Sequence, residues 1–116
     1  MTTIYGINNC DTVKKAQKWL ANHNIENEFF DFKKQTLTNE LLEKFVSLSS
    51  WEKLINKRST TYRNLNEEIK ANLNNEVAFN TVLNSPTLLK RPLLLHKGKL
   101  HLGFKDAQYQ EIFANE

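Results

Sequence analysis

The order of apolar patterns in the N-terminal segment constrains the fold of this chain more than any other feature. Residues Thr2 to Ile7 are β-branched, aromatic or small, which is typical of a short buried strand. From Asp11 to about His23, apolar residues recur every three or four positions and predict an amphipathic helix. Ile25 to Phe32 ends in aromatic residues and predicts a second strand. Because a helix of this length makes a crossover connection, the two strands should be parallel.

The middle of the chain predicts a series of short helices. Thr38 is a candidate N-cap, because its hydroxyl can accept from a backbone N–H left unpaired at the start of a helix that ends near Leu48. Asparagines separate the helices that follow, which are predicted over 51–55, 65–73 and 77–83. We expect a helical insertion at about 38–84.

The C-terminal segment predicts a β-hairpin and a last helix. Leu93 to His96 and Leu100 to Leu102 are two apolar runs joined by Lys97-Gly98-Lys99, and a helix is predicted over 105–113. Without the insertion, the order β-α-β, β-β-α is the minimal arrangement of a thioredoxin-like α/β fold with a four-stranded mixed sheet. Since 116 residues are too few for two comfortable domains, we expect a single domain over 1–116.

Composition excludes several classes of protein. The formal net charge is only +3, and the lysines are interspersed with acidic residues, so nucleic acid is not singled out as a partner. No run of apolar residues approaches the roughly 20 that a membrane span requires. One cysteine and three scattered histidines lack the spacing of a metal site. We expect a soluble cytoplasmic protein that binds no metal, membrane or nucleic acid.

Cys10, the only cysteine, lies between the first strand and the first helix. The unpaired N–H groups and the positive dipole end of a helix N-terminus stabilise a thiolate, which is the nucleophilic form. Lys14, one turn on, adds to this effect, whereas Asp11 either opposes it by repulsion or favours the helix end. The alternative is a thiol that only fills space between strand and helix. The polar neighbours of Cys10 favour the reactive role.

Arg91-Pro92 directly precedes the third predicted strand. A proline is tolerated there because the first residue of a strand need not donate to the ladder. In a thioredoxin-type sheet a cis peptide bond at this place would bring Arg91 close to Cys10. Its guanidinium would then hold an oxyanion or a carboxylate, unless Arg91 is a solvated surface charge.

A basic, hydroxyl-rich loop is predicted over Asn56 to Arg63, between two helices. It is either a second wall of an anion site or a solvated connection anchored by Tyr62. The histidines show no recognisable acid–base spacing, and we interpret them as surface or strand residues: His23, His96 and His101.

Three separated motifs carry a family resemblance. YGINNCDTVKKAQKWL, KRSTTYRNL and SPTLLKRPLL occur in this order and span the chain from the first strand towards the final helix. Together they resemble the arsenate reductase (ArsC)/Spx family, and within it the YffB-like subgroup. The resemblance implies a thioredoxin fold with a helical insertion.

The resemblance also implies roles for particular residues. The family's active cysteine falls on Cys10, its arginine in the helical insertion on Arg58, and its arginine before the strand proline on Arg91. The arsenate reductases use a further arginine after the hairpin, and that position falls within 103–105, on Phe104. Four more residues are expected to help bind substrate or glutathione: Asn9, Thr12, Lys14 and Pro92.

The function expected from these observations is a glutathione-dependent thiol/disulfide reductase. Cys10 is the nucleophile, and because no second cysteine exists, an external thiol must resolve the adduct. We expect no tightly bound cofactor, glutathione as co-substrate, glutaredoxin as a partner, and a small anionic or disulfide substrate. The first alternative is a non-catalytic, Spx-like regulator that docks on an RNA polymerase subunit. The second is an arsenate reductase, against which the missing arginine argues.

Overall fold

The computed structural model describes residues 2–71 and 75–114. Contacts divide the chain into two compact units. Unit 1 combines both ends of the chain, up to Gln35 and from Arg91 onward, and unit 2 runs from Thr36 to Lys90. The insertion predicted at about 38–84 falls within unit 2. That residues 1–116 fold cooperatively as a single domain stays a prediction.

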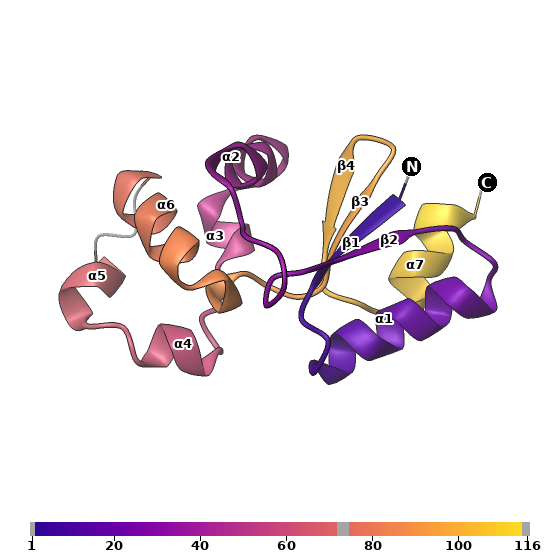
Figure 1. The fold of residues 1–116 in the computed structure, drawn as a ribbon, viewed down its shortest axis with the longest axis horizontal. Coiled ribbons are helices and arrows are strands. Elements are labelled where there is room, and N and C mark those ends of the chain that lie inside the picture. Colours follow the sequence, from indigo (N-terminus) through magenta and orange to yellow (C-terminus); the bar gives the residue numbers. More distant parts are fainter. Residues whose placement is uncertain (1, 72–74, 115–116) are drawn as a thin grey trace. The chain divides into compact units, whose positions relative to one another are not determined.

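Unit 1 contains a four-stranded sheet with strand order β2-β1-β3-β4 (Figure 1). The first and second strands pair in parallel, and the other two pairings are antiparallel. This confirms the predicted mixed sheet and the thioredoxin-like fold. The elements of unit 1 are β1 (Thr2–Gly6), α1 (Asp11–Asn22), β2 (Glu28–Asp31), β3 (Leu93–His96), β4 (Lys99–Leu102) and α7 (Asp106–Phe113).

The core of unit 1 lies on the sheet face that α1 and α7 cover (Figure 1). Ile4 of β1 and Leu94 of β3 are fully buried there. The two helices meet through aromatic rings, with the Trp19 and Tyr109 ring centroids 5.5 Å apart and nearly perpendicular. The opposite face carries aromatic residues of the two parallel strands, where the rings of Tyr5 and Phe30 are 5.4 Å apart.

Gly6 permits a close approach between β1 and α1. A Cβ atom at this position would lie 2.7 Å from Cγ2 of Val13, closer than van der Waals contact allows. Val13 is fully buried, and its β-branched side chain has little rotamer freedom in a helix. The last residue of the strand therefore fixes how closely the first turn of α1 can pack.

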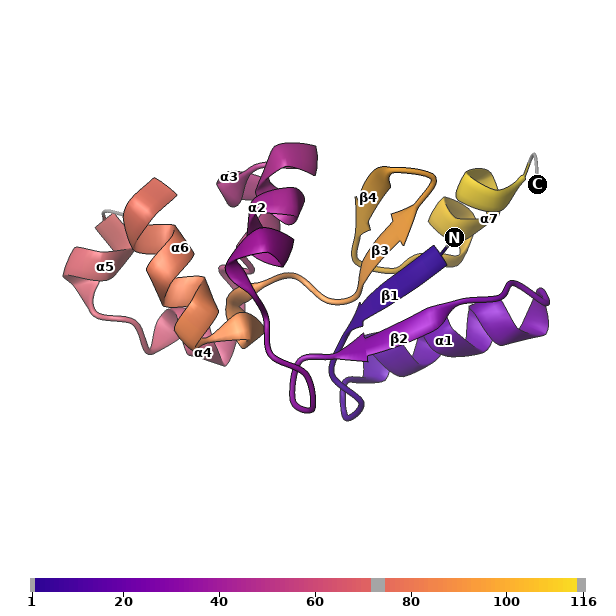
Figure 2. The same ribbon diagram turned by 45° about the horizontal axis from the view of Figure 1, so that its top comes forward.

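Unit 2 is helical. Its elements are α2 (Asn39–Leu48), α3 (Trp51–Leu54), α4 (Thr60–Arg63), α5 (Glu67–Ala71), α6 (Asn75–Asn84) and a 3₁₀ turn, η1 (Pro86–Leu88) (Figure 2). The predicted cap is confirmed, because Thr38 accepts a hydrogen bond from the Leu41 N–H at 3.2 Å. Leu42, Phe45, Leu54 and Val82 are fully buried. Within the described residues of both units, none of the helices has the length and apolar character to traverse a bilayer.

The structure corrects one prediction in unit 2. The segment 56–63 was expected to be a loop, but its second half is α4. Ser59 caps this helix by accepting from the Tyr62 N–H at 3.1 Å. A short turn has too few residues for an apolar period, so only the hydroxyl cap indicated it. Part of the helix predicted over 65–73 also lies outside the described residues.

Strand boundaries differ from prediction at the hairpin turn and in β2. Lys99 belongs to β4, so Lys97-Gly98 alone form the turn, with φ of 51° and 76°. Positive φ at both central residues is the geometry that matches the twist of a two-residue hairpin. β2 begins at Glu28, later than the predicted Ile25.

Candidate active site

Cys10 is the N-cap residue of α1, with an extended backbone at φ −98° and ψ 123°. Its carbonyl accepts the N–H of Lys14 at 3.0 Å, the first hydrogen bond of the helix. Its sulfur makes no capping hydrogen bond, and the residue is half-buried. The thiol therefore lies beside the unpaired N–H groups of the first turn, and it is accessible enough to meet a reactant.

The residues next to Cys10 form an open surface. Asn9 and Lys14 are exposed, and Thr12 is half-buried. Asp11, also exposed, is the first residue of α1 and places a carboxylate in the first turn. The predicted residues Asn9, Thr12 and Lys14 therefore lie near Cys10 because they are close to it in the sequence.

Arg91-Pro92 lies at the same end of the sheet as Cys10. Tyr5 of β1 faces Leu93 of β3 in antiparallel register, so the two residues before Leu93 run beside the end of β1 that leads to Cys10. The Arg91-Pro92 peptide bond is cis, the isomer that the fold suggested. Pro92 is buried, and its carbonyl accepts the Gly103 N–H at 2.9 Å.

The Arg91 side chain is half-buried, and its Nε atom is buried without a hydrogen-bond partner among residues 2–71 and 75–114. A buried guanidinium donor without an acceptor costs free energy, because the group has lost its water. An anion that reaches this nitrogen would supply the acceptor. This is the strongest anion-binding feature that the structure gives to any of the predicted arginines.

Arg58 belongs to unit 2, where it lies two residues before the start of α4. Its side chain is exposed, and its backbone N–H donates to Oδ1 of Asn56 at 3.0 Å. Asn56 in turn donates its N–H to Leu88, which connects this segment to the 3₁₀ turn. The backbone that presents Arg58 is therefore held in place by unit 2 itself.

Phe104 is the residue on which the resemblance places the further arginine of the arsenate reductases. It packs against the core of unit 1, and its ring stands perpendicular to that of Tyr109 at a centroid distance of 4.7 Å. This position holds an apolar residue that stabilises α7, and no donor for an oxyanion. Lys105, the neighbouring cation, is exposed.

No group of three or more metal-ligating side chains occurs within the part of the chain that the structure describes. Sequence reasoning missed another cluster of titratable groups. His96, Lys99 and His101 line one pocket together with α7. The register of the hairpin carried the signal, because a two-residue Lys97-Gly98 turn places His96 opposite Lys99.

The model of the ArsC family matches residues 5–112. The chain belongs to the ArsC family. This match includes the Cys10 loop, the helical unit 2 and the Arg91-Pro92 segment.

Relatives and solved structures refine this assignment. A Haemophilus influenzae protein without a described function is 47% identical, over 98% of this chain and all of its own. The regulatory protein MgsR of Bacillus subtilis is 32% identical, over 95% of this chain and 88% of its own.

Two solved structures are similar over nearly their whole length. A YffB protein is 35% identical with a TM-score of 0.89, over 96% of this chain and 97% of its own. An ArsC-related protein from Brucella melitensis is 46% identical with a TM-score of 0.80, over 97% of this chain and 93% of its own. The chain is thus an ArsC-family protein of the YffB-like group.

Proposed function

We propose that this protein is a cytoplasmic, glutathione-dependent thiol/disulfide reductase with Cys10 as its nucleophile. The observation that carries the proposal is the half-buried thiol at the N-cap of α1, with its sulfur free of any capping hydrogen bond. Membership of the ArsC family, which includes reductases, supports it. The cytoplasm supplies the reducing glutathione that the reaction consumes.

The reaction follows from thiol–disulfide exchange. The Cys10 thiolate attacks one sulfur of a substrate disulfide, a new Cys10–S bond forms, and the other sulfur leaves as a thiolate that takes up a proton. A glutathione thiolate then attacks the sulfur bonded to Cys10, which releases the Cys10 thiolate and a mixed disulfide of glutathione. A second glutathione reduces that mixed disulfide, so two glutathione thiols are oxidised for each disulfide reduced. Glutaredoxin is the partner we expect for this last step.

Arg91 is the residue we propose to hold an anionic group during the exchange. Its buried Nε lacks an acceptor within the described residues, and glutathione carries carboxylates that an arginine binds well. We also propose Arg58 as a binding residue, on the resemblance of its motif. Asn9, Thr12, Lys14 and Pro92 are further binding residues in this proposal.

The test is mass spectrometry of the intact protein after incubation with oxidised glutathione. We expect a single glutathionyl adduct, which dithiothreitol removes. Cys10→Ser should show no adduct and no turnover of a glutathione mixed disulfide. If the wild-type protein forms no adduct under conditions that modify an exposed thiol, the reductase proposal is wrong.

The arginines are tested by the rate of adduct formation. Arg91→Gln and Arg58→Gln should each slow it, because each variant removes a cation that we propose to bind an anionic group of glutathione. Lys53→Gln is the matched control, since Lys53 is an exposed cation of α3 that is not among the proposed binding residues. Equal rates in all three variants would show that the arginines do not bind glutathione.

The second candidate is a non-catalytic regulator that docks on an RNA polymerase subunit. The similarity to MgsR, a regulatory protein, favours it. A single cysteine cannot form an intramolecular disulfide, so docking on the polymerase would not be controlled by such a switch. Retention of a polymerase subunit by the Cys10→Ser variant, together with no disulfide turnover by the wild type, would favour this candidate.

Arsenate reduction is a third candidate, and Phe104 argues against it. An apolar ring packed on Tyr109 cannot replace a planar, charged donor. We expect no arsenate-dependent oxidation of glutathione in a coupled assay with glutaredoxin.

A further inference from the structure

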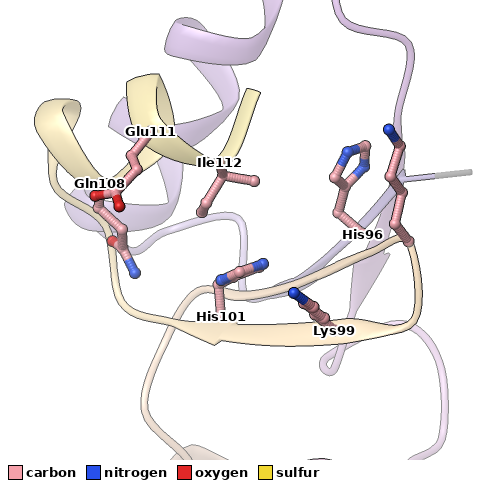
Figure 3. Close-up of a pocket in the computed structure, with 7 residues that line it drawn as sticks. His96, Lys99, His101, Gln108, Glu111 and Ile112 are labelled. Carbon is pink, nitrogen blue, oxygen red and sulfur yellow. The ribbon is translucent and has the colours of Figure 1, made fainter. Parts of the chain in front are cut away.

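A pocket of about 510 Å³ lies between the β3–β4 hairpin and α7. Its volume is in the range of small-molecule sites, roughly 300–1,000 Å³. Figure 3 shows side chains of the hairpin on one side of the hollow and side chains of α7 on the other. The pocket is remote from the proposed active site along the sheet, because His96 faces Thr2, at the opposite end of β1 from Cys10.

The hairpin side of the pocket is basic. His96 and Lys99 are directly opposite each other in the antiparallel register, and His101 lies two residues beyond Lys99 on the same face of β4. Lys97, in the turn, also lines the pocket. Basic residues placed opposite each other across a strand pair repel when both are charged, so this arrangement costs stability.

The α7 side provides one apolar wall and one carboxylate. Ile112 faces the hairpin in Figure 3 and is half-buried. Gln108 connects the two sides, since its amide donates to the Leu102 carbonyl at 3.2 Å and its Oε1 accepts the Lys105 N–H at 3.2 Å. Among the lining residues that the structure describes, Glu111 is the only acidic one, against two lysines and two histidines.

The charges in the pocket act on His101. Burial lowers the pKa of its imidazole first, and the neighbouring His96 and Lys99 lower it further. Each of these effects disfavours the cationic imidazole, and a bound anion would offset the two electrostatic ones. The titratable groups that line the pocket with His101 are His96 of β3, Lys97 of the turn, Lys99 of β4 and Glu111 of α7.

We propose that this pocket binds a small polyanion with phosphate or carboxylate groups, held by Lys99 and His101 against the Ile112 side of α7. Lysine and imidazolium donate hydrogen bonds to such groups. Lys99 and His101 lie two residues apart on the same face of β4, a separation of roughly 7 Å along the strand. A ligand that carries two anionic groups can therefore engage both side chains at once.

The experiment is a titration of the full chain with inorganic pyrophosphate and, in parallel, with citrate, at constant ionic strength. Imidazole ring signals are followed by NMR and assigned with His→Gln variants. We expect saturable shifts of the His96 and His101 signals, an increase in the pKa of His101, and no shift of His23, which caps the end of α1. Saturable binding of either probe supports the site, and the tighter one identifies the chemical class.

Charge variants test the site in both directions. Lys99→Gln should weaken binding about fivefold, and Glu111→Gln should strengthen it, because the carboxylate repels the anion. Lys33→Gln is the matched control, since Lys33 is an exposed cation of unit 1 that does not line the pocket. Cys10→Ser should bind both probes as the wild type does, which separates this site from the reductase chemistry.

Two results would overturn the proposal. In the first, neither probe shifts the His101 signal more than sodium chloride does at the same ionic strength. In the second, Lys99→Gln binds the probes with unchanged affinity and Glu111→Gln does not bind them more tightly.

Discussion

Gly6 is the last residue of β1, packs against Val13 of α1, and is four residues before Cys10. Gly6→Ala should lower the free energy of unfolding by about 1–3 kcal/mol, because the new methyl group overlaps the stiff, buried side chain of Val13. Urea denaturation measures this loss. We also expect a slower reaction of Cys10 with glutathione disulfide, since the first turn of α1 must shift.

Val13 provides the control for this substitution. Val13→Ala removes the methyl groups that the new Cβ would strike. The Gly6→Ala/Val13→Ala double variant should therefore lose less stability than the sum of the single variants. Strict additivity would mean that the two positions do not clash.

Tyr109 is fully buried, and its hydroxyl has no hydrogen-bond partner within the described residues. Tyr109→Phe should raise the free energy of unfolding by about 1 kcal/mol, because an unsatisfied buried hydroxyl costs free energy and the ring contacts remain. Tyr62→Phe, at a half-buried position of unit 2, should change it little. A loss of stability in Tyr109→Phe would reveal a partner for the hydroxyl.

Tyr109 should also make the free energy of unfolding depend on pH in alkaline solution. Burial raises the pKa of Tyr109 far above its usual value, so the folded state keeps a proton that the unfolded state releases above about pH 10. Stability is complete below that pH and declines as pH rises, by up to about 1.4 kcal/mol per pH unit. Tyr109→Phe should flatten this decline in urea denaturations at pH 9 to 11. Some slope remains, because burial also raises the pKa of Tyr5.

The hairpin is the element whose stability should respond to acid. The pKa of His101 is lowered by burial and then by His96 and Lys99, so the unfolded state takes up a proton more readily than the folded state. This contribution is present above about pH 6.5 and is lost as pH falls through the folded pKa. His101→Gln should therefore narrow the difference between urea midpoints at pH 7.5 and pH 5. An unchanged difference would exclude His101 as its source.

Elements with a clear period could be predicted from the sequence. The apolar spacing of Val13, Ala16, Trp19 and Leu20 gave α1 nearly to its ends, and these are the residues that α1 buries. The crossover length predicted the parallel pairing of β1 and β2, and the Lys97-Gly98 turn predicted the hairpin. Cys10 could be placed at the helix start because the strand and helix patterns leave only a short loop between them.

Features that depend on tertiary packing could not be predicted. α4 is a single turn, too short for any period, and its Ser59 cap resembles an ordinary loop hydroxyl. The burial of the Arg91 Nε atom is a property of the folded chain, and no local sequence pattern indicates it. The basic pocket also needs α7 opposite the hairpin, and no local pattern shows that His96 and His101 line a hollow against that helix.

At the scale of the whole molecule, each compact unit contains one of the two tryptophans, Trp19 in unit 1 and Trp51 in unit 2. In Trp51→Phe, fluorescence reports unit 1 alone, whereas far-UV circular dichroism reports the helices of both. We expect the two urea transitions to coincide, because a unit of this size is marginal without further burial. Separate midpoints would contradict the prediction of a single domain.

A core substitution in unit 2 sharpens this experiment. Leu42 is fully buried there, and Leu42→Ala typically costs about 2–5 kcal/mol at such a site. If the chain unfolds as one domain, the midpoint reported by Trp19 must fall as well. A Trp19 transition that does not move would show that unit 1 unfolds by itself.

The strand order has a consequence for synthesis of the chain on the ribosome. β1 lies between β2 and β3, but β3 begins only at Leu93, after all of unit 2 has been made. Until then one edge of β1 has no hydrogen-bonding partner, and such edges are prone to pair with other chains. The helical unit, which is continuous in sequence, can form during this interval. The surroundings of Cys10 are completed only when Arg91, Pro92 and β3 emerge, so a nascent chain exposes the Cys10 thiol before the part of unit 1 that adjoins it has been made.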